Sequence, residues 1–223
     1  MPLPQALRRL TPDRVRDDPR VRAVALGAGL IPPRTMHSDR EAATLARLAS
    51  DAQRVVELGV YEGSSAVVLA RAMATGSELV LVDPYTADTR WAALPQGAWA
   101  NATASRLAVA RARRSDGPRI RWILRRSQDV GRSWTGGPVD LVFIDGDHSY
   151  EGCLEDWEQW RGHVSPRGYA AFHDARAGKP DGHGAPGPTQ VVDEAFRGGE
   201  HSGWTLAEEI DALVVVRRHA RAG

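Results

Sequence analysis

The sequence has little cysteine and no long apolar run. Its only cysteine is Cys153, so no disulfide can form within the chain, which fits a reducing cytoplasm. No uncharged stretch reaches the roughly 18 apolar residues that a membrane span needs. The first ten residues contain no apolar run of the kind that a secretory signal requires. We therefore expect a cytoplasmic protein without a membrane partner.

The sequence also lacks an excess of charge of either sign. The 29 basic and 28 acidic residues leave a formal net charge of +1, which gives no reason to expect nucleic acid as a partner. The chain has 223 residues, of which 42% are hydrophobic and 26% charged, as in ordinary globular proteins. That length can bury a sizeable core without disulfides and fits one large domain or two small ones.

Short apolar segments alternate with helical patterns along most of the chain. The strand candidates are rich in Val, Ile or Leu, as in a parallel sheet covered on both faces. They span residues 54–60, 77–83, 119–124, 139–145 and 168–174. Helical spacing is found between them, over residues 64–74, 98–114 and 150–164. This alternation predicts an α/β fold with a doubly wound, mostly parallel sheet.

The last third of the chain contains a loop signal and a hairpin signal. Residues 176–190 are dense in glycine and proline, which predicts a mobile loop. Residues 203–211 and 212–218 lie too close together for a helical crossover, so they should end the sheet as an antiparallel hairpin.

The first fifty residues stand outside the alternation of strands and helices. Within them, Ser38 and Glu41 form a capping box, which predicts a helix over residues 38–50. We assign residues 1–50 to an N-terminal helical addition and residues 51–223 to the core domain.

A glycine turn follows the first predicted strand. Gly59 and Gly63 would let the backbone turn tightly and approach a ligand, and the helix beginning near Ser64 would offer free N–H groups. Asp83 ends the next strand, where an acid can bind a ribose hydroxyl. Ligands of open α/β sheets bind at the carboxyl ends of the strands, so we expect a cofactor site here. The simpler alternative is a turn that only joins a strand to a helix.

The turn departs from the dinucleotide fingerprint G-x-G-x-x-G. The segment GVYEGSS lacks the middle glycine, and Val60 or Tyr61 would crowd a pyrophosphate. Glu57 at the strand end would repel a pyrophosphate and attract a cation. These features favour S-adenosylmethionine, with its ammonium and sulfonium groups, over a nicotinamide dinucleotide.

Several motifs resemble class I S-adenosylmethionine-dependent O-methyltransferases. VVELGVYEGSSAVVLARA is similar to the first motif of the catechol O-methyltransferase-like branch, and RRSQD is similar to its adenine-contacting segment. VFIDGDHSYEG followed by GYAAFHDA resembles metal-dependent sugar O-methyltransferases of the macrocin and mycobacterial methylmannose polysaccharide types, and the similarity covers roughly residues 35 to 217. The resemblance implies a cofactor site formed by Glu57, Gly59, Tyr61, Gly63, Ser64, Ser65, Asp83, Ser127, Gln128 and Asp145.

A second group of polar residues follows the fourth and fifth predicted strands. Asp145 ends one strand, and His173 and Asp174 end the next. Neighbouring parallel strands lie about 4.8 Å apart, so these side chains should meet at the edge that carries the glycine turn. Two carboxylates so close repel each other unless a cation lies between them, and oxygen ligands suit Mg²⁺ or Mn²⁺.

The resemblance assigns roles to this second group. It implies that Asp145 and Asp174 bind the metal, that the residue before Asp174 takes part, and that His148 is the general base. Many relatives have a carboxylate where this chain has His173, and a histidine shifts the expected metal towards Mn²⁺. The predicted activity is metal-dependent transfer of a methyl group from S-adenosylmethionine to a sugar hydroxyl, with His148 and Asp145 as catalytic residues.

The same residues allow other interpretations. His148, His173 and Asp174 could hold non-haem Fe(II) in a hydroxylase, but the glycine turn would then have no role. A catechol-like small molecule could replace the sugar as acceptor, or the fold could serve only binding or assembly. Asp147 with Ser149 is better explained as a helix cap, and His173 could be a buried core histidine.

The sequence gives less information about the pocket for the methyl acceptor and about the oligomeric state. Residues 86–99 and 176–190 lie at the binding edge and could shape and close the pocket, and the resemblance implies that residues 31–39 cover the methionine end of the cofactor. Relatives are often dimers or larger, so we expect a homo-oligomer. Tryptophans are more often core residues, but four of them could stack on a sugar: Trp91, Trp99, Trp157 and Trp160.

Overall fold

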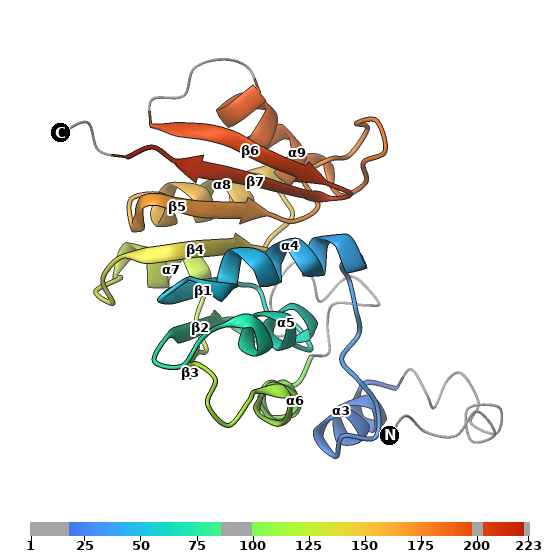
Figure 1. Cartoon of the computed structure of the whole chain (residues 1–223). Helices are drawn as coiled ribbons and strands as arrows, with labels where there is room; N and C mark the ends of the chain where they lie inside the picture. The colour runs from blue at the N-terminus through green and yellow to red at the C-terminus, as the bar shows by residue number, and fades with distance from the viewer. Residues whose placement is uncertain (1–17, 86–99, 198–202, 221–223) are drawn as a thin grey trace.

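Seven strands form one sheet in the computed structural model, which describes residues 18–85, 100–197 and 203–220 (Figure 1). Their order is β3-β2-β1-β4-β5-β7-β6, and β7 runs antiparallel to both of its neighbours, β5 and β6, while the other pairs are parallel. The predicted doubly wound, mostly parallel α/β fold is therefore confirmed. The strands are β1 (Arg54–Leu58), β2 (Glu78–Val82), β3 (Arg119–Ile123), β4 (Val139–Ile144), β5 (Val164–Phe172), β6 (Trp204–Ile210) and β7 (Leu213–Arg218).

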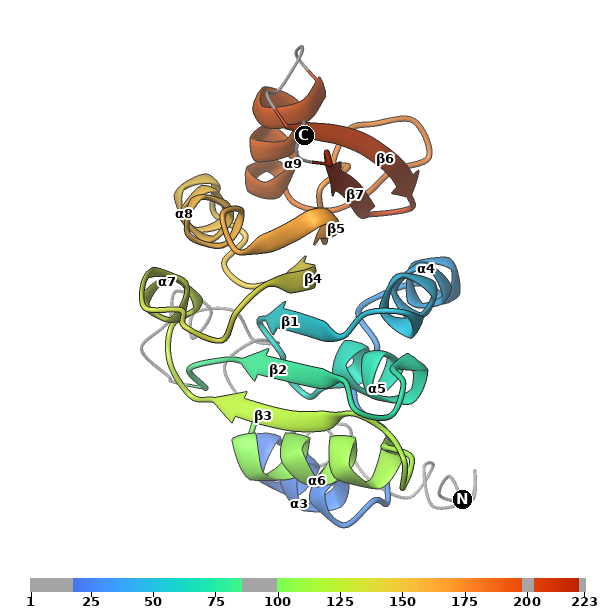
Figure 2. The ribbon, with the colours of Figure 1, turned by 60° about the vertical axis from the view of Figure 1, so that its left-hand side comes forward.

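Helices cover both faces of this sheet (Figure 2). One face carries α4 (Asp39–Ser50), α5 (Ser64–Ala72) and α6 (Ala102–Ala112), and α3 (Pro19–Gly27) packs on the outside of α6. The other face carries α7 (Ser127–Arg132), α8 (Tyr150–Trp160) and α9 (Pro186–Val192), which continues as a π-helical turn, η2 (Asp193–Arg197). None of the helices in the described residues is both long and apolar enough to cross a membrane.

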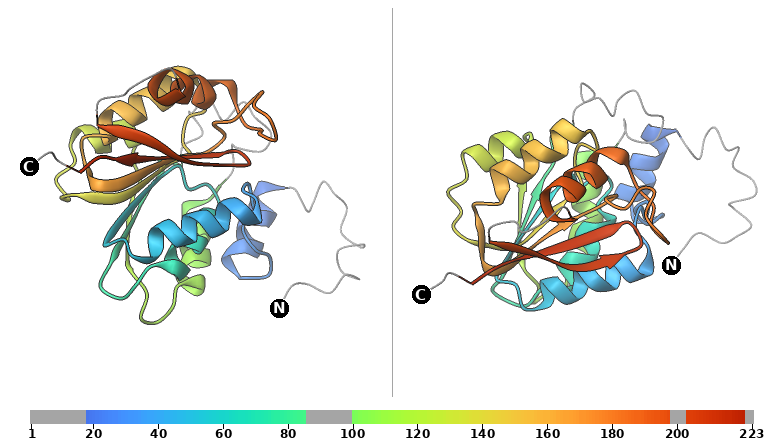
Figure 3. Two further views of the ribbon diagram at one scale, coloured as in Figure 1. Left: turned by 45° about the horizontal axis from the view of Figure 1, so that its top comes forward. Right: turned by 90° about the horizontal axis from the view of Figure 1, so that it is seen from above.

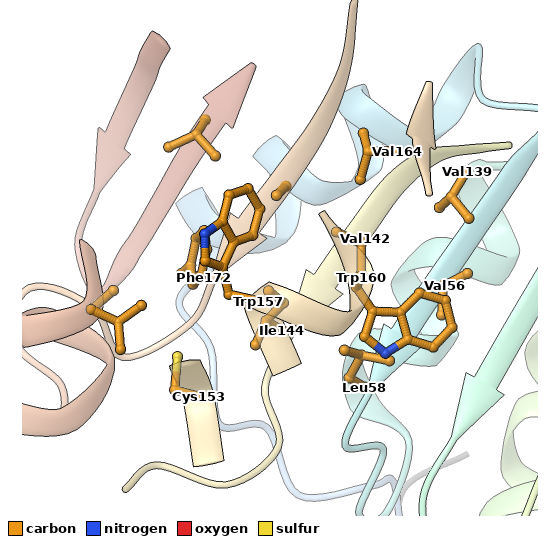
Figure 4. Packing of buried hydrophobic residues seen from close by; sticks show 14 of the residues in the cluster. Val56, Leu58, Val139, Val142, Ile144, Cys153, Trp157, Trp160, Val164 and Phe172 are labelled. Carbon is orange, nitrogen blue, oxygen red and sulfur yellow. The ribbon is translucent and has the colours of Figure 1, made fainter. Parts of the chain in front are cut away.

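The period of two along each strand divides the core into two clusters, one on each face of the sheet. Val55 of β1 belongs to the cluster under α4 and α5, whereas its neighbour Val56 belongs to the cluster under α7 and α8. Trp157 and Trp160 of α8 lie in the second cluster, where Trp157 packs against Phe172 (Figure 4). Both strand faces are buried in this way, which explains the nearly continuous apolar runs in the sequence.

The C-terminal hairpin is confirmed, because β6 and β7 pair in antiparallel fashion and β7 extends the sheet beyond β5 (Figure 3). The helix predicted over residues 38–50 is α4, with the predicted capping box at its start. Helix α4 buries Leu45, Leu48 and Ala49 in the core. The domain boundary at residue 50 stays a prediction.

Two predicted segments near β5 differ from the structure. The helix predicted over residues 150–164 ends at Trp160, and the next strand begins at Val164 instead of residue 168. The loop predicted over residues 176–190 is wrong in its last part, because α9 begins at Pro186. Proline lacks an N–H group, but the first turn of a helix does not need one, so a proline-rich stretch can start a helix.

The sheet brings three strand ends together at one edge. Leu58 of β1 pairs with Ile144 of β4, which pairs with Phe172 of β5. The ladder continues for one more step, since the backbone N–H of Asp145 donates to Leu58 and that of His173 donates to Ile144. The residues that follow β1, β4 and β5 are therefore neighbours in space.

Candidate functional site

The glycine turn lies directly against the end of β4. Gly59 has a φ of +84°, and a Cβ atom at this position would overlap the carbonyl group of Asp145 and lie 2.8 Å from the Cα atom of Gly146. The sequence predicts that glycine here permits close approach to a ligand, but the close approach that the structure shows is to the backbone after β4. Gly63 is also left-handed, with a φ of +89°, and immediately precedes α5, which begins at Ser64.

Asp83 holds this turn in place. One carboxylate oxygen, Oδ2, accepts hydrogen bonds from the backbone of Val60 at 2.8 Å and Tyr61 at 2.9 Å, and Oδ1 accepts one from Tyr85 at 2.8 Å. Burial raises the pKa of Asp83 although these amides oppose the shift, and the nearby Asp145 raises it further. If Asp83 also binds the ribose, as we predict, its carboxylate would do so while it accepts these three backbone hydrogen bonds.

Glu57 is fully buried at the end of β1. It accepts a hydrogen bond from the Ser65 hydroxyl of α5, while its Oε2 atom has no hydrogen-bond partner. Burial raises the pKa of Glu57 well above its usual range, the Ser65 hydroxyl opposes this, and the charges of Asp145 and Asp83 add to it. A buried carboxyl with an unused oxygen beside two further acids is a site that a cation would stabilise.

The predicted adenine segment forms the start of α7. Ser127 and Gln128 are both buried, and the Ser127 hydroxyl donates to Asp156 of α8 at 2.5 Å. Asp156 is a buried acid that the sequence analysis missed, and burial raises its pKa to about 7 despite the Ser127 hydrogen bond. Its place between Cys153 and Trp160 on the inward face of α8 is the sequence signal that could have identified it.

The second polar group assembles as predicted at the ends of β4 and β5. Nδ1 of His173 lies 3.0 Å from Oδ1 of Asp145 and 3.7 Å from Oδ2 of Asp174. Nε2 of His148 lies 3.0 Å from Oδ2 of Asp174 and 3.5 Å from Oδ1 of Asp145. Asp174 adopts a φ of +52°, a strained conformation that often marks functional sites.

The ligand atoms of this cluster lie close enough together to hold one ion. One ligand atom each from Asp145, His148 and His173 lies within 4.8 Å of the others. The sequence analysis made His148 a ligand only in the hydroxylase alternative and a base in the methyltransferase, whereas in the structure its ring also lies among the atoms that could hold an ion. Nitrogen and carboxylate donors together suit Mn²⁺ or another transition ion better than Mg²⁺, which prefers oxygen alone.

The acids and histidines of the cluster strongly shift one another's pKa values. Burial alone would raise the pKa of Asp145, but His173 and His148 outweigh it and hold that pKa below its usual range. Burial alone would lower the pKa of His148, but Asp145 and Asp174 raise it to about 9. His148 therefore keeps its proton at neutral pH while both carboxylates face it. His148 can accept a proton only after a second cation, such as a metal ion, has neutralised the carboxylates of Asp145 and Asp174.

Two further expectations concern capping and stacking. Asp147 accepts a hydrogen bond from the Ser149 backbone at 2.8 Å, and Ser149 caps α8, which confirms the capping interpretation. Trp157 and Trp160 are core residues, exposed by 6% and 0%, so they do not offer a face to a sugar. Trp91, Trp99 and the segment 86–99 lie outside the described residues.

A cavity lies away from this cluster, at the opposite edge of the sheet. It has a volume of about 1160 Å³, and its lining includes Gln53, Ser77 and Arg119 at the amino ends of β1, β2 and β3. The polar clusters described above lie at the carboxyl ends, where ligands of open α/β sheets bind, so we do not assign the cofactor to this cavity.

Comparison with known proteins gives a family match. A family model described as a methyltransferase domain matches residues 56–175, which is more than half of the chain and includes the glycine turn, Asp83, Asp145, His148 and Asp174. None of the curated proteins matches the chain significantly.

Solved structures share the fold over most of their length. Cofactor-bound Rv0187 from MTB is 21% identical, with 91% of this chain and 90% of that one covered and a TM-score of 0.60. The O-methyltransferase TomG from Streptomyces achromogenes, solved with S-adenosylmethionine, is 18% identical, with 91% and 90% covered and a TM-score of 0.59. The O-methyltransferase NovP is 16% identical, with 90% and 89% covered and a TM-score of 0.63.

Proposed function

This chain belongs to the methyltransferase domain family, and on that premise we propose that it transfers a methyl group from S-adenosylmethionine to a hydroxyl of a sugar, with the help of a divalent metal ion. The observation that carries the proposal is the convergence of Asp145, Asp174 and His148 beside the glycine turn. Two carboxylates, a histidine and a cofactor loop at one sheet edge are what a metal-assisted methyl transfer to oxygen requires.

The cofactor is assigned to the turn between β1 and α5. The fully buried Glu57 and the partly buried Asp83 place two acids there, which suit the ammonium, sulfonium and ribose groups of S-adenosylmethionine. The backbone N–H groups at the start of α5 and the buried pair Ser127 and Gln128 complete the proposed site. TomG, which has the same fold, was solved with this cofactor.

The metal is assigned to the cluster between β4 and β5. Asp145 and Asp174 would provide oxygen ligands and His173 a nitrogen ligand, a set that fits Mn²⁺ and accepts Mg²⁺. Such an ion, when bound, stabilises the charge that develops on the acceptor oxygen. The protein's own part is to hold the acids together, which it does through the pairing of β4 with β5.

His148 is the proposed general base. An alcohol is about as weakly acidic as water, whereas histidine has an ordinary pKa of about 6.5, so unassisted proton transfer would cost roughly 13 kcal/mol. The transfer is therefore expected to accompany methyl attack. The acceptor oxygen forms a bond to the methyl carbon, and the hydroxyl proton passes to His148. The electron pair of the broken S–CH₃ bond stays on sulfur, which leaves S-adenosylhomocysteine.

The acceptor class rests on the resemblance of residues 143–153 and 168–175 to sugar O-methyltransferases. A catechol-like acceptor is the second candidate, because the same ligand set could hold two neighbouring oxygens. Membership of a methyltransferase family disfavours the hydroxylase alternative. A small-molecule or oligosaccharide acceptor, a homo-oligomeric state and a cytoplasmic location also stay proposals.

The test is an assay of the purified chain with S-adenosylmethionine and parallel panels of glycosides and catechols, read by mass spectrometry for a methylated product. EDTA should abolish turnover, and Mn²⁺ should restore it better than Mg²⁺. Full activity in EDTA would remove the metal from the mechanism. Methylation of catechols alone would replace the sugar. Calorimetric binding of 2-oxoglutarate without binding of S-adenosylmethionine would overturn the whole proposal.

A further inference from the structure

Glu41 of α4 is fully buried, although a capping box alone does not require burial. Its Oε2 atom accepts a hydrogen bond from the Ser38 backbone at 2.7 Å, which closes the box. Its Oε1 atom accepts one from the backbone of Ala212 at 2.6 Å, in the turn between β6 and β7. Oε2 also lies 3.7 Å from Nε2 of His173. One side chain thus joins the N-terminal helix, the C-terminal hairpin and the polar cluster.

The ring of His173 lies between two sets of carboxylates. Nδ1 faces Asp145 at 3.0 Å and Asp174 at 3.7 Å, while Nε2 has Glu41 at ion-pair distance and no hydrogen-bond partner. The ring is only 4% exposed, and Phe143 packs edge-on against it with centroids 6.0 Å apart. The ring therefore has little freedom to present another atom to the cluster.

A histidine that binds a metal through one nitrogen usually directs the N–H of the other towards a carboxylate, which fixes its tautomer and orientation. Glu41 is the carboxylate that faces Nε2, at 3.7 Å, and two backbone amides hold both of its oxygens in position. We propose that Glu41 is a positioning residue that keeps the proton of His173 on Nε2 and leaves Nδ1 for the metal. This inference rests on the metal-dependent function proposed above and makes α4 part of the metal site.

The experiment is a Mn²⁺ titration of the full chain, followed by electron paramagnetic resonance without S-adenosylmethionine or acceptor. Glu41→Gln keeps the size of the side chain, but its amide can donate to Nε2 and so favour the wrong tautomer. Its Mn²⁺ affinity should fall by about 10- to 100-fold. The matched control is Ser38→Ala, which removes the hydroxyl that caps the backbone of Glu41 but leaves the Glu41 carboxylate facing His173. Its Mn²⁺ affinity should stay at the wild-type value.

A double variant separates positioning from simple loss of stability. If Glu41 acts through His173, Glu41→Gln should cause little further loss of Mn²⁺ affinity in a His173→Ala background. Equal loss with and without His173, equal loss in Ser38→Ala, or wild-type affinity in Glu41→Gln would each overturn the inference. Failure of the wild-type chain to bind Mn²⁺ at all would instead overturn the proposed metal-dependent function.

Discussion

Gly59 and the backbone of Asp145 interlock at the centre of the site. A side chain at residue 59 would occupy the space of the Asp145 carbonyl group. The proposed cofactor turn after β1 thus packs directly against the end of β4, where the proposed metal ligand Asp145 lies. Their relative position, on which alignment of the methyl group and the acceptor oxygen depends, is fixed by backbone packing.

Gly59→Ala should therefore be far more damaging than a matched change at another left-handed glycine. Gly76 has the same φ of +84°, but a Cβ atom there would meet no atom within 4 Å. Gly76→Ala should cost only the left-handed strain, about 1–2 kcal/mol. Gly59→Ala must also displace the backbone after β4, so its free energy of unfolding should fall several kcal/mol further. Urea denaturation of both variants measures this, and equal losses would contradict the packing argument.

The buried acid Asp156 should make stability depend on pH. Its pKa is about 7 in the folded chain and 3.8 for an ordinary aspartate. Between these values the folded state keeps a proton that the unfolded state has lost, so its contribution to stability falls as the pH rises. About three pH units correspond to an upper limit on the order of 4 kcal/mol. The free energy of unfolding of Asp156→Asn, minus that of the wild type, should rise between pH 4 and 8. A flat difference would contradict the assignment.

Much of the fold was predictable, because both faces of the central strands are buried and their sequences are correspondingly apolar. Asp145, His173 and Asp174 could be placed together for the same reason, since neighbouring parallel strands end at one edge. The start of α9 at Pro186 was not predicted, because glycine and proline content indicates a break without saying where the next helix begins.

The tertiary partners of Glu41 and Asp156 were beyond sequence reasoning. The capping box accounts for Glu41 locally, and nothing near it in sequence indicates Ala212 or His173. Asp156 lies on the inward face of α8, but nothing near it in sequence indicates Ser127 as its hydrogen-bond partner. Contacts between segments far apart in the chain depend on the angles at which helices cross the sheet, and residue periodicity does not specify these angles.

Glu57→Gln should weaken binding of S-adenosylmethionine. The change keeps the shape of the side chain and a hydrogen-bond acceptor for Ser65, but it removes the charge that a cationic cofactor would stabilise. Loss of a charge-assisted interaction of about 1.5–3 kcal/mol corresponds to a roughly 10- to 100-fold weaker Kd. Isothermal titration calorimetry gives the Kd. The control is Glu78→Gln, which alters a buried carboxylate at the amino end of β2, away from the proposed cofactor site. This variant should bind S-adenosylmethionine with the wild-type Kd. Unchanged affinity in Glu57→Gln would remove Glu57 from the cofactor site.

His148→Ala should abolish methyl transfer while the chain still binds its cofactor. Nε2 of His148 lies among the proposed metal ligands, at the place where an acceptor hydroxyl would lose its proton. A positioned general base contributes typically 10²–10⁴-fold, so kcat should fall by about that factor while the Kd for S-adenosylmethionine changes little. The control is His219→Ala, an exposed histidine that contacts Thr205 of the hairpin. A wild-type kcat in His148→Ala would show that another group accepts the proton. A parallel loss of Mn²⁺ binding would show that His148 also acts as a ligand.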